Sequence, residues 1–163
     1  MNTLTRIMAH LQISLGVLCL VIFLLATLVQ VSTRYLGISV LWTEEIAVNA
    51  FIWAMFLGAS VMVKEKQHFG FNAISNKLTG IKGCYLSLFQ NLCMLTFCVF
   101  CAIYSIEITQ VFWNSRWISI PEFKQGYVWL IMPITFISSG VYLIQQILEE
   151  LQPFFKGKSW NSQ

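Results

Sequence analysis

The sequence has few charged residues. Only 10% of its 163 residues are Asp, Glu, Lys or Arg, whereas 57% are hydrophobic and the mean hydropathy is +0.70. A soluble domain carries roughly a quarter charged residues, because its surface has to be solvated. This scarcity excludes a water-soluble globule as the main body of the chain, and we expect an integral membrane protein.

The sequence also lacks the residues that catalytic and cofactor sites require. Haem iron commonly takes histidine ligands, but the two histidines, His10 and His68, lie at or outside the ends of the apolar runs. No nucleophile stands with a base and an orienting acid, and there is no phosphate-binding loop or metal cluster. We therefore expect no catalysis, no cofactor and no metal in this chain, and no nucleic-acid partner.

Long apolar runs are what the sequence has in abundance. A bilayer-spanning helix needs about 20 mostly apolar residues, and residues 11–33, 41–63, 84–108 and 126–148 each provide them. The first run exceeds the roughly 7–15 apolar residues of a signal peptide. The fourth contains Pro133, which neighbouring groups can accommodate. We predict an all-α integral membrane fold, with residues 1–163 forming one membrane domain of four transmembrane helices.

Basic residues are unevenly distributed about these spans. Seven of the ten lie on the side of the two termini and the second connection, namely Arg6, Lys64, Lys66, Lys77, Lys82, Lys156 and Lys158. The positive-inside rule therefore predicts cytoplasmic termini. An aromatic belt is expected at the outer boundary, formed by Trp42, Trp113, Trp117 and Trp129.

Cys98 and Cys101 form a CxxC pair within the third span. A zinc site would need a second pair of ligands, and a reactive thiol would need an electropositive setting. Neither accompanies this pair, so we interpret the cysteines as packing residues.

The second span has two unlike sides that both suit protein contact. At 100° per residue, one side is polar and the opposite side is small. The polar side holds Glu45, Asn49, Phe56 and Ser60, and the small side holds Ala47, Ala50, Ala54 and Gly58. Small residues allow close approach within the subunit. The polar side needs partners that four short helices can hardly provide, which suggests a second polypeptide.

Two interpretations of Glu44 and Glu45 stay open. If Thr43 caps the helix, both carboxylates lie near the positive end of the helix dipole in the headgroup zone, with Arg34 as a possible partner. Alternatively, they form an ion pair with another subunit. Neither interpretation requires proton transfer.

Polar residues are fewer in the other spans. We interpret the first span as a helix that faces lipid or packs against the other helices. In the third span, Gln90 and Asn91 point about 100° apart, so we expect bonds to neighbouring helices. Glu107 lies near the outer end of the same span.

The connection between the second and third spans is basic and has an apolar edge. We predict a short interfacial amphipathic helix at residues 69–79, lying on anionic lipid headgroups. Its interface residues are Lys64, Lys66, Phe69, Phe71, Ile74, Lys77, Leu78 and Lys82.

Several motifs between residues 34 and 68 resemble a known family. They are Arg34-Tyr35-Leu36-Gly37, Leu41-Trp42-Thr43-Glu44-Glu45, Phe56-Leu57-Gly58-Ala59 and Lys64-Glu65-Lys66-Gln67-His68. Together with the length and the four spans, they resemble the small membrane subunit, or Q subunit, of the tripartite ATP-independent periplasmic (TRAP) transporters of bacteria and archaea.

The resemblance implies two partners besides membrane lipid: a large multi-span permease subunit, which holds the substrate and sodium sites, and a periplasmic substrate-binding protein. The small subunit would scaffold the large one in the bacterial inner membrane, for ion-coupled uptake of an organic acid of the dicarboxylate or sialic acid class. The residues that we assign to the motif or to subunit contact are Arg34, Tyr35, Trp42, Glu44, Glu45, Asn49, Gly58, Ser60 and His68.

Two other functions are weighed against this one. A stand-alone four-helix exporter would need a carboxylate embedded in the membrane, but the first span has none and the glutamates sit at helix ends. The other is a membrane anchor subunit of a different complex, with no haem ligands of its own.

Overall fold

The computed structural model describes residues 3–38, 40–65 and 81–155. These residues form α1 (Thr3–Tyr35), α2 (Leu41–Lys64), α4 (Ile81–Val111), α5 (Gly126–Trp129) and α6 (Ile131–Phe155). Within them, four helical segments are long and apolar enough to cross a membrane, the fourth running through α5 into α6. The predicted all-α fold with four transmembrane helices is confirmed. The amphipathic helix predicted at 69–79 lies outside the described residues.

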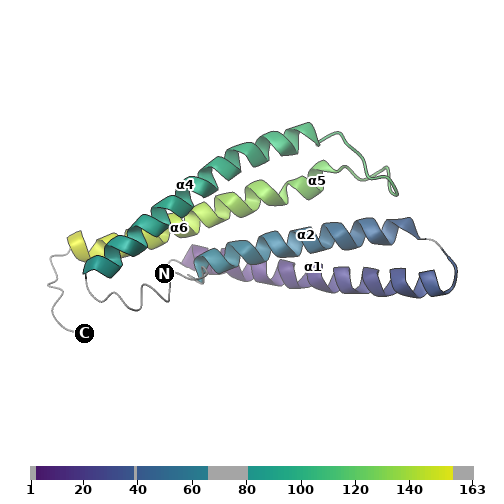
Figure 1. Cartoon of the computed structure of the whole chain (residues 1–163), viewed down its shortest axis with the longest axis horizontal. Coiled ribbons are helices and arrows are strands. Elements are labelled where there is room, and N and C mark those ends of the chain that lie inside the picture. Colours follow the sequence, from purple (N-terminus) through teal and green to yellow (C-terminus); the bar gives the residue numbers. More distant parts are fainter. Residues whose placement is uncertain (1–2, 39, 66–80, 156–163) are drawn as a thin grey trace.

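The long helices form two hairpins, as Figure 1 shows. The first pairs α1 with α2, and the second pairs α4 with α5 and α6. The hairpins meet chiefly along α2 and α6, which gives the packing order α1, α2, α6, α4. The start of α1 and the end of α6 lie at the same end of the bundle, here called the termini end. The α1–α2 turn and the loop of residues 112–125 lie at the other, the loop end.

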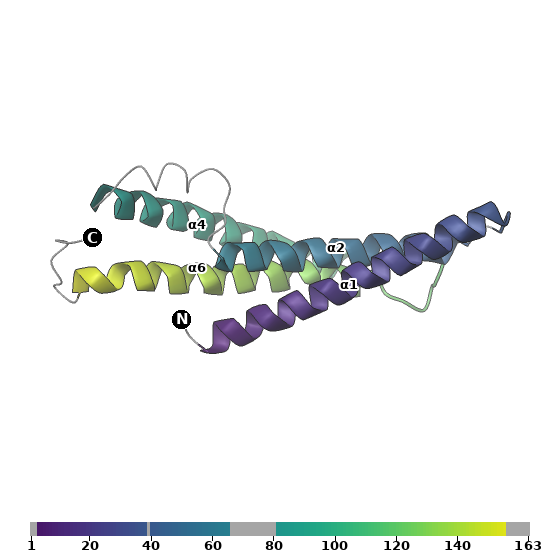
Figure 2. The same cartoon turned by 90° about the horizontal axis from the view of Figure 1, so that it is seen from below.

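Helix α1 begins earlier than the sequence predicted. It starts at Thr3 rather than Leu11 and has 33 residues, a length of about 50 Å at 1.5 Å per residue. The hydrocarbon core of a bilayer is about 30 Å thick, so α1 must tilt or extend beyond it. Figure 2 shows α1 crossing α2 obliquely.

A narrow seam of α1 packs against the rest of the bundle. Its buried residues recur every three or four positions and are mostly small: Thr5, Ala9, Gln12, Gly16, Cys19 and Ala26. Close approach is needed at Gly16, where an added Cβ would lie 3.6 Å from the Cβ of Leu57 on α2. This packing of small residues replaces the hydrophobic driving force that helices lack in lipid.

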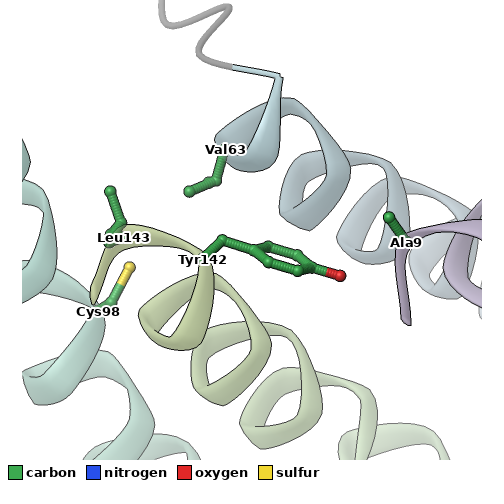
Figure 3. Close-up of a cluster of buried hydrophobic side chains, with 5 residues drawn as sticks. All are labelled: Ala9, Val63, Cys98, Tyr142 and Leu143. Carbon is green, nitrogen blue, oxygen red and sulfur yellow. The ribbon is translucent and has the colours of Figure 1, made fainter. Parts of the chain in front are cut away.

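The buried apolar cluster joins all four long helices near the termini end. It consists of Ala9, Val63, Cys98, Tyr142 and Leu143. Figure 3 shows Tyr142 extending from α6 toward Ala9 of α1, while the next residue, Leu143, turns toward Cys98 of α4. Successive residues of α6 therefore lie on opposite sides of the helix, Tyr142 on the side of the first hairpin and Leu143 on the side of α4.

Pro133 lies near the junction of α5 and α6. Proline has no backbone N–H, so the carbonyl of Trp129 loses its helical partner. The Thr109 hydroxyl of α4 lies 3.3 Å from that carbonyl oxygen and 2.7 Å from the carbonyl of Ser105. Its single proton can serve one of them at a time. A neighbouring helix thus offers the freed carbonyl a donor, as expected for proline in a membrane helix.

Candidate functional site

A cluster of neutral polar side chains lies between α1, α2 and α6. Gln12 Nε2 donates to Ser138 Oγ at 2.8 Å and lies 3.3 Å from Ser60 Oγ. The Tyr142 hydroxyl donates to Gln12 Oε1 at 2.8 Å, and the two serine oxygens are 2.8 Å apart. All four residues are buried. We call these residues the glutamine cluster.

The polar groups of the glutamine cluster have their partners within the bundle, and Ser138 Oγ also donates to the Thr135 carbonyl at 2.9 Å. Both ends of the Gln12 amide have partners, as buried polar groups require. Its side chains carry neither a carboxylate nor a basic group, so in this form it binds no proton for exchange. What it does is join the first hairpin to the second, because Gln12 and Ser60 belong to one and Ser138 and Tyr142 to the other.

A second polar tie lies at the termini end. Gln146 Nε2 of α6 lies 2.9 Å from the carbonyl of Val63 and 3.2 Å from that of Lys64. These carbonyls belong to the last turn of α2, and the last carbonyls of a helix have no partner within it. The Gln146 side chain therefore caps α2 and holds the second hairpin against the first.

Glu150 ties α4 to α6 at the same end. Its carboxylate accepts hydrogen bonds from Ser87 Oγ at 2.7 Å and from Asn91 Nδ2 at 3.2 Å. The prediction that Asn91 bonds to a neighbouring helix is confirmed.

A third tie between the hairpins lies at the loop end. The two oxygens of Glu45 accept the backbone N–H groups of Ile118 and Ser119, at 2.8 and 2.9 Å. The loop that presents these groups is folded by its own backbone bonds, such as Gln125 N–H to the Ser115 carbonyl at 2.8 Å. Charge-assisted hydrogen bonds of this kind are stronger than neutral ones, so Glu45 fixes the 112–125 loop over the start of α2.

Aromatic rings surround this loop. Phe112 stacks on Trp129 with centroids 5.3 Å apart, and Trp113 meets Tyr127 edge-on at 5.7 Å. The four tryptophans expected in the aromatic belt all belong to segments at the loop end. Trp117 and Trp129 have buried ring N–H groups with no acceptor among the described residues.

The structure corrects part of the analysis of α2. Helix α2 begins after Val40, which makes no side-chain cap, and the Thr43 hydroxyl donates instead to the Val40 carbonyl at 2.8 Å. Thr43 therefore does not cap the helix, which was the condition of the first interpretation of the two glutamates. The argument that Glu45 and Ser60 need partners from another polypeptide is wrong, because their own chain supplies them through segments that are distant in the sequence.

The stripe of small residues is also interrupted. Ala47 and Ala54 are buried, but Gly58 is exposed and a Cβ added there would meet nothing within 4 Å. Gly58 therefore does not serve helix packing within this subunit.

Most other residues assigned to the motif lie at the surface. Arg34, Tyr35, Trp42 and Glu44 are exposed, and Asn49 is half-buried. No ion pair joins Arg34 to either glutamate in the described part of the chain. A role in contacting another subunit stays a prediction for all of them.

The predicted interface residues fall largely outside the described ranges. Lys64 is half-buried, and its Nζ atom lies 3.4 Å from Oε1 of Glu65 in a salt bridge. The other interface residues and the motif residue His68 lie outside the described residues, namely Lys66, His68, Phe69, Phe71, Ile74, Lys77 and Leu78. Lys82 lies in α4, but its side chain is not described.

Sequence reasoning missed the residues that join the hairpins, Gln12, Ser138, Tyr142 and Gln146. One signal was available, since Gln12 stands between Ala9 and Gly16 on the small-residue seam of α1. A polar side chain on a seam of close packing has to find partners across the interface.

The described residues contain no group of three or more His, Cys, Asp or Glu that could hold a metal ion. Cys98 and Cys101 are free thiols, and Cys98 is buried in the apolar cluster. The geometry thus offers helix packing and polar ties rather than a reaction centre.

Comparison with known proteins agrees with this picture. A search of curated proteins gave no match. A family model described as "Tripartite ATP-independent periplasmic transporters, DctQ component" matches residues 23–152, which include the last part of α1, all of α2, α4 and α5, and most of α6. Because the match covers well over half of the chain, this protein belongs to the DctQ component family of the tripartite ATP-independent periplasmic transporters.

Proposed function

We propose that this chain scaffolds and anchors the large permease subunit of a TRAP transporter, which takes up an organic acid with a coupling ion, expected to be sodium. A periplasmic binding protein delivers the acid, of the dicarboxylate or sialic acid class. The chain itself holds no cofactor and performs no catalysis. The observation that carries this proposal is the use of the buried polar groups: they find their partners within this subunit and tie its two hairpins together.

Helix α2 offers one surface for the large subunit. Exposed residues follow one line along it, at three- and four-residue spacing: Val48, Phe51, Met55, Gly58 and Met62. The open space at Gly58 would let a helix of another chain approach closely, as small residues do in membranes.

The proposal includes an orientation in the bacterial inner membrane. Both termini face the cytoplasm, because seven of the ten basic residues lie on their side. The loop end then faces the periplasm. A reporter that is active only in the periplasm should be active when inserted near Ser119 and silent when fused after Gln163. The reverse pattern would overturn the orientation.

Copurification tests the proposal as a whole. The tagged chain is expressed together with a candidate large permease subunit and purified in mild detergent. We expect the large subunit to copurify, and uptake by the reconstituted complex to depend on the binding protein. Transport by this chain alone would favour a stand-alone exporter. Copurification with an unrelated enzyme would favour an anchor of another complex.

A further inference from the structure

Glu107 is a carboxylate on the outward face of α4. Residues buried on α4, such as Cys98 and Ser105, lie nearly opposite it around the helix axis at 100° per residue. Glu107 is exposed and has no hydrogen-bond or ion-pair partner among the described residues. The other described helices pack against the opposite side of α4.

The surroundings of Glu107 are apolar. Ile103 and Val111, one turn to either side, are exposed on the same face. Glu107 lies four residues before the end of α4, about 6 Å along its axis. Ionisable residues within membrane helices rarely face lipid and usually have a partner. This carboxylate therefore calls for a donor from outside the subunit.

Glu107 belongs to a line of exposed residues with alternating three- and four-residue spacing. The line consists of Cys93, Thr96, Phe100, Ile103, Glu107 and Gln110. Such spacing forms the seam along which one helix packs against another. Several of its members are polar or small enough to pack closely.

Helix α1 provides the contrast. A line of exposed residues with the same three- and four-residue spacing on α1 is wholly aliphatic: Leu11, Leu15, Leu18, Ile22, Leu25 and Val29. A purely aliphatic line is compatible with lipid along its length. The line on α4 differs, because near the loop end it includes a carboxylate that has no partner among the described residues.

We propose that the exposed line of α4 seats a transmembrane helix of the large permease subunit, which presents an arginine or lysine side chain to Glu107. This inference rests on the proposed function and adds a second contact surface to that on α2. The partner's cation neutralises the carboxylate, and its helix covers Phe100 and Ile103.

Photo-crosslinking tests the contact in the intact complex. A benzophenone amino acid replaces Ile103 on the α4 line or, as a matched control, Ile22 on the α1 line. We expect Ile103 to crosslink to the large subunit, and Ile22 to give little protein product. Equal crosslinking at both positions, crosslinking of Ile103 only to a second copy of this chain, or no protein crosslink at Ile103 would each overturn the assignment.

A substitution separates a protein partner from lipid. Glu107→Leu should lower recovery of the large subunit about threefold or more, while the chain itself inserts and expresses as before. Glu122→Leu, which removes an exposed glutamate in the 112–125 loop, should leave recovery unchanged. If Glu107 instead faced lipid, leucine would leave the complex intact, and the inference would fail. Failure of the wild-type chain to copurify with the large subunit would reject the proposed function itself.

Discussion

The carboxylate of Glu45 on α2 accepts the backbone N–H of Ser119 at 2.9 Å, although the two residues are 74 positions apart in the chain. With the bond to Ile118, this contact places the 112–125 loop over the start of α2. A residue of the first hairpin thereby holds a loop of the second hairpin in position.

Glu45→Gln should loosen this loop. A glutamine amide has one acceptor oxygen and a donor group, so it cannot accept both N–H groups. The contact lies partly in water, and its loss should cost about 1 kcal/mol locally. Hydrogen exchange at Ile118 and Ser119 should then rise about three- to tenfold. Glu44→Gln is the matched control, because Glu44 is exposed and should change nothing. Equal effects of both substitutions would contradict the contact.

Gln12→Leu should weaken the union of the hairpins. The substitution leaves the Tyr142 hydroxyl without its acceptor and removes the amide that donates to Ser138. We expect a cost of about 1 kcal/mol, since hydrogen bonds within membrane proteins average about 0.6 kcal/mol and reach about 1.7 kcal/mol. Unfolding of the purified chain in detergent measures this loss. Ser14→Leu, on the exposed side of α1, should leave stability unchanged.

A double-mutant cycle checks that Gln12 and Tyr142 act together. Tyr142→Phe removes only the hydroxyl that donates to Gln12 Oε1. The double variant should lose less stability than the two single losses added together, because both remove the same bond. Strict additivity would show that the bond contributes nothing.

Thr109→Val should destabilise the junction of α5 and α6. It removes the only side-chain donor near the Trp129 carbonyl in the described part of the chain, at a cost of about 1 kcal/mol. Adding Pro133→Ala should restore much of the loss, because alanine provides the backbone N–H that this carbonyl lacks. If the second change gives no recovery in a thermal unfolding assay, the role assigned to Thr109 is wrong.

Two glycines should respond in opposite ways to alanine. An added Cβ at Gly126 would lie 2.8 Å from the backbone of Trp113, so Gly126→Ala should destabilise the chain by about 1–3 kcal/mol. Gly58 has open space, and Gly58→Ala should stabilise the isolated chain by about 0.5–1 kcal/mol. The melting temperature of each purified variant provides the test. A loss at Gly58 matching that at Gly126 would contradict the packing described.

The four spans could be predicted because long apolar runs dominate this sequence. Element boundaries were less accurate: α1 begins eight residues earlier than predicted, since its first turns continue the buried seam. The glutamine cluster could not be predicted locally, because Ser138 and Tyr142 lie 126 and 130 residues from Gln12. The partners of Glu45 could not be predicted either, because they are backbone N–H groups, which every loop has. Both omissions led to the same error, an overestimate of how many polar groups another chain must satisfy.

The central claim is that this chain holds the transporter together and takes no part in moving its cargo. The most direct test is the uptake rate per assembled complex when the glutamine cluster is removed by Gln12→Leu, Ser60→Ala and Ser138→Ala. Proteoliposomes provide the rate, and the copurified large subunit gives the number of complexes. We predict fewer complexes, each transporting at the wild-type rate. Wild-type numbers of complexes with lost uptake would contradict the claim, because these side chains would then act in transport itself.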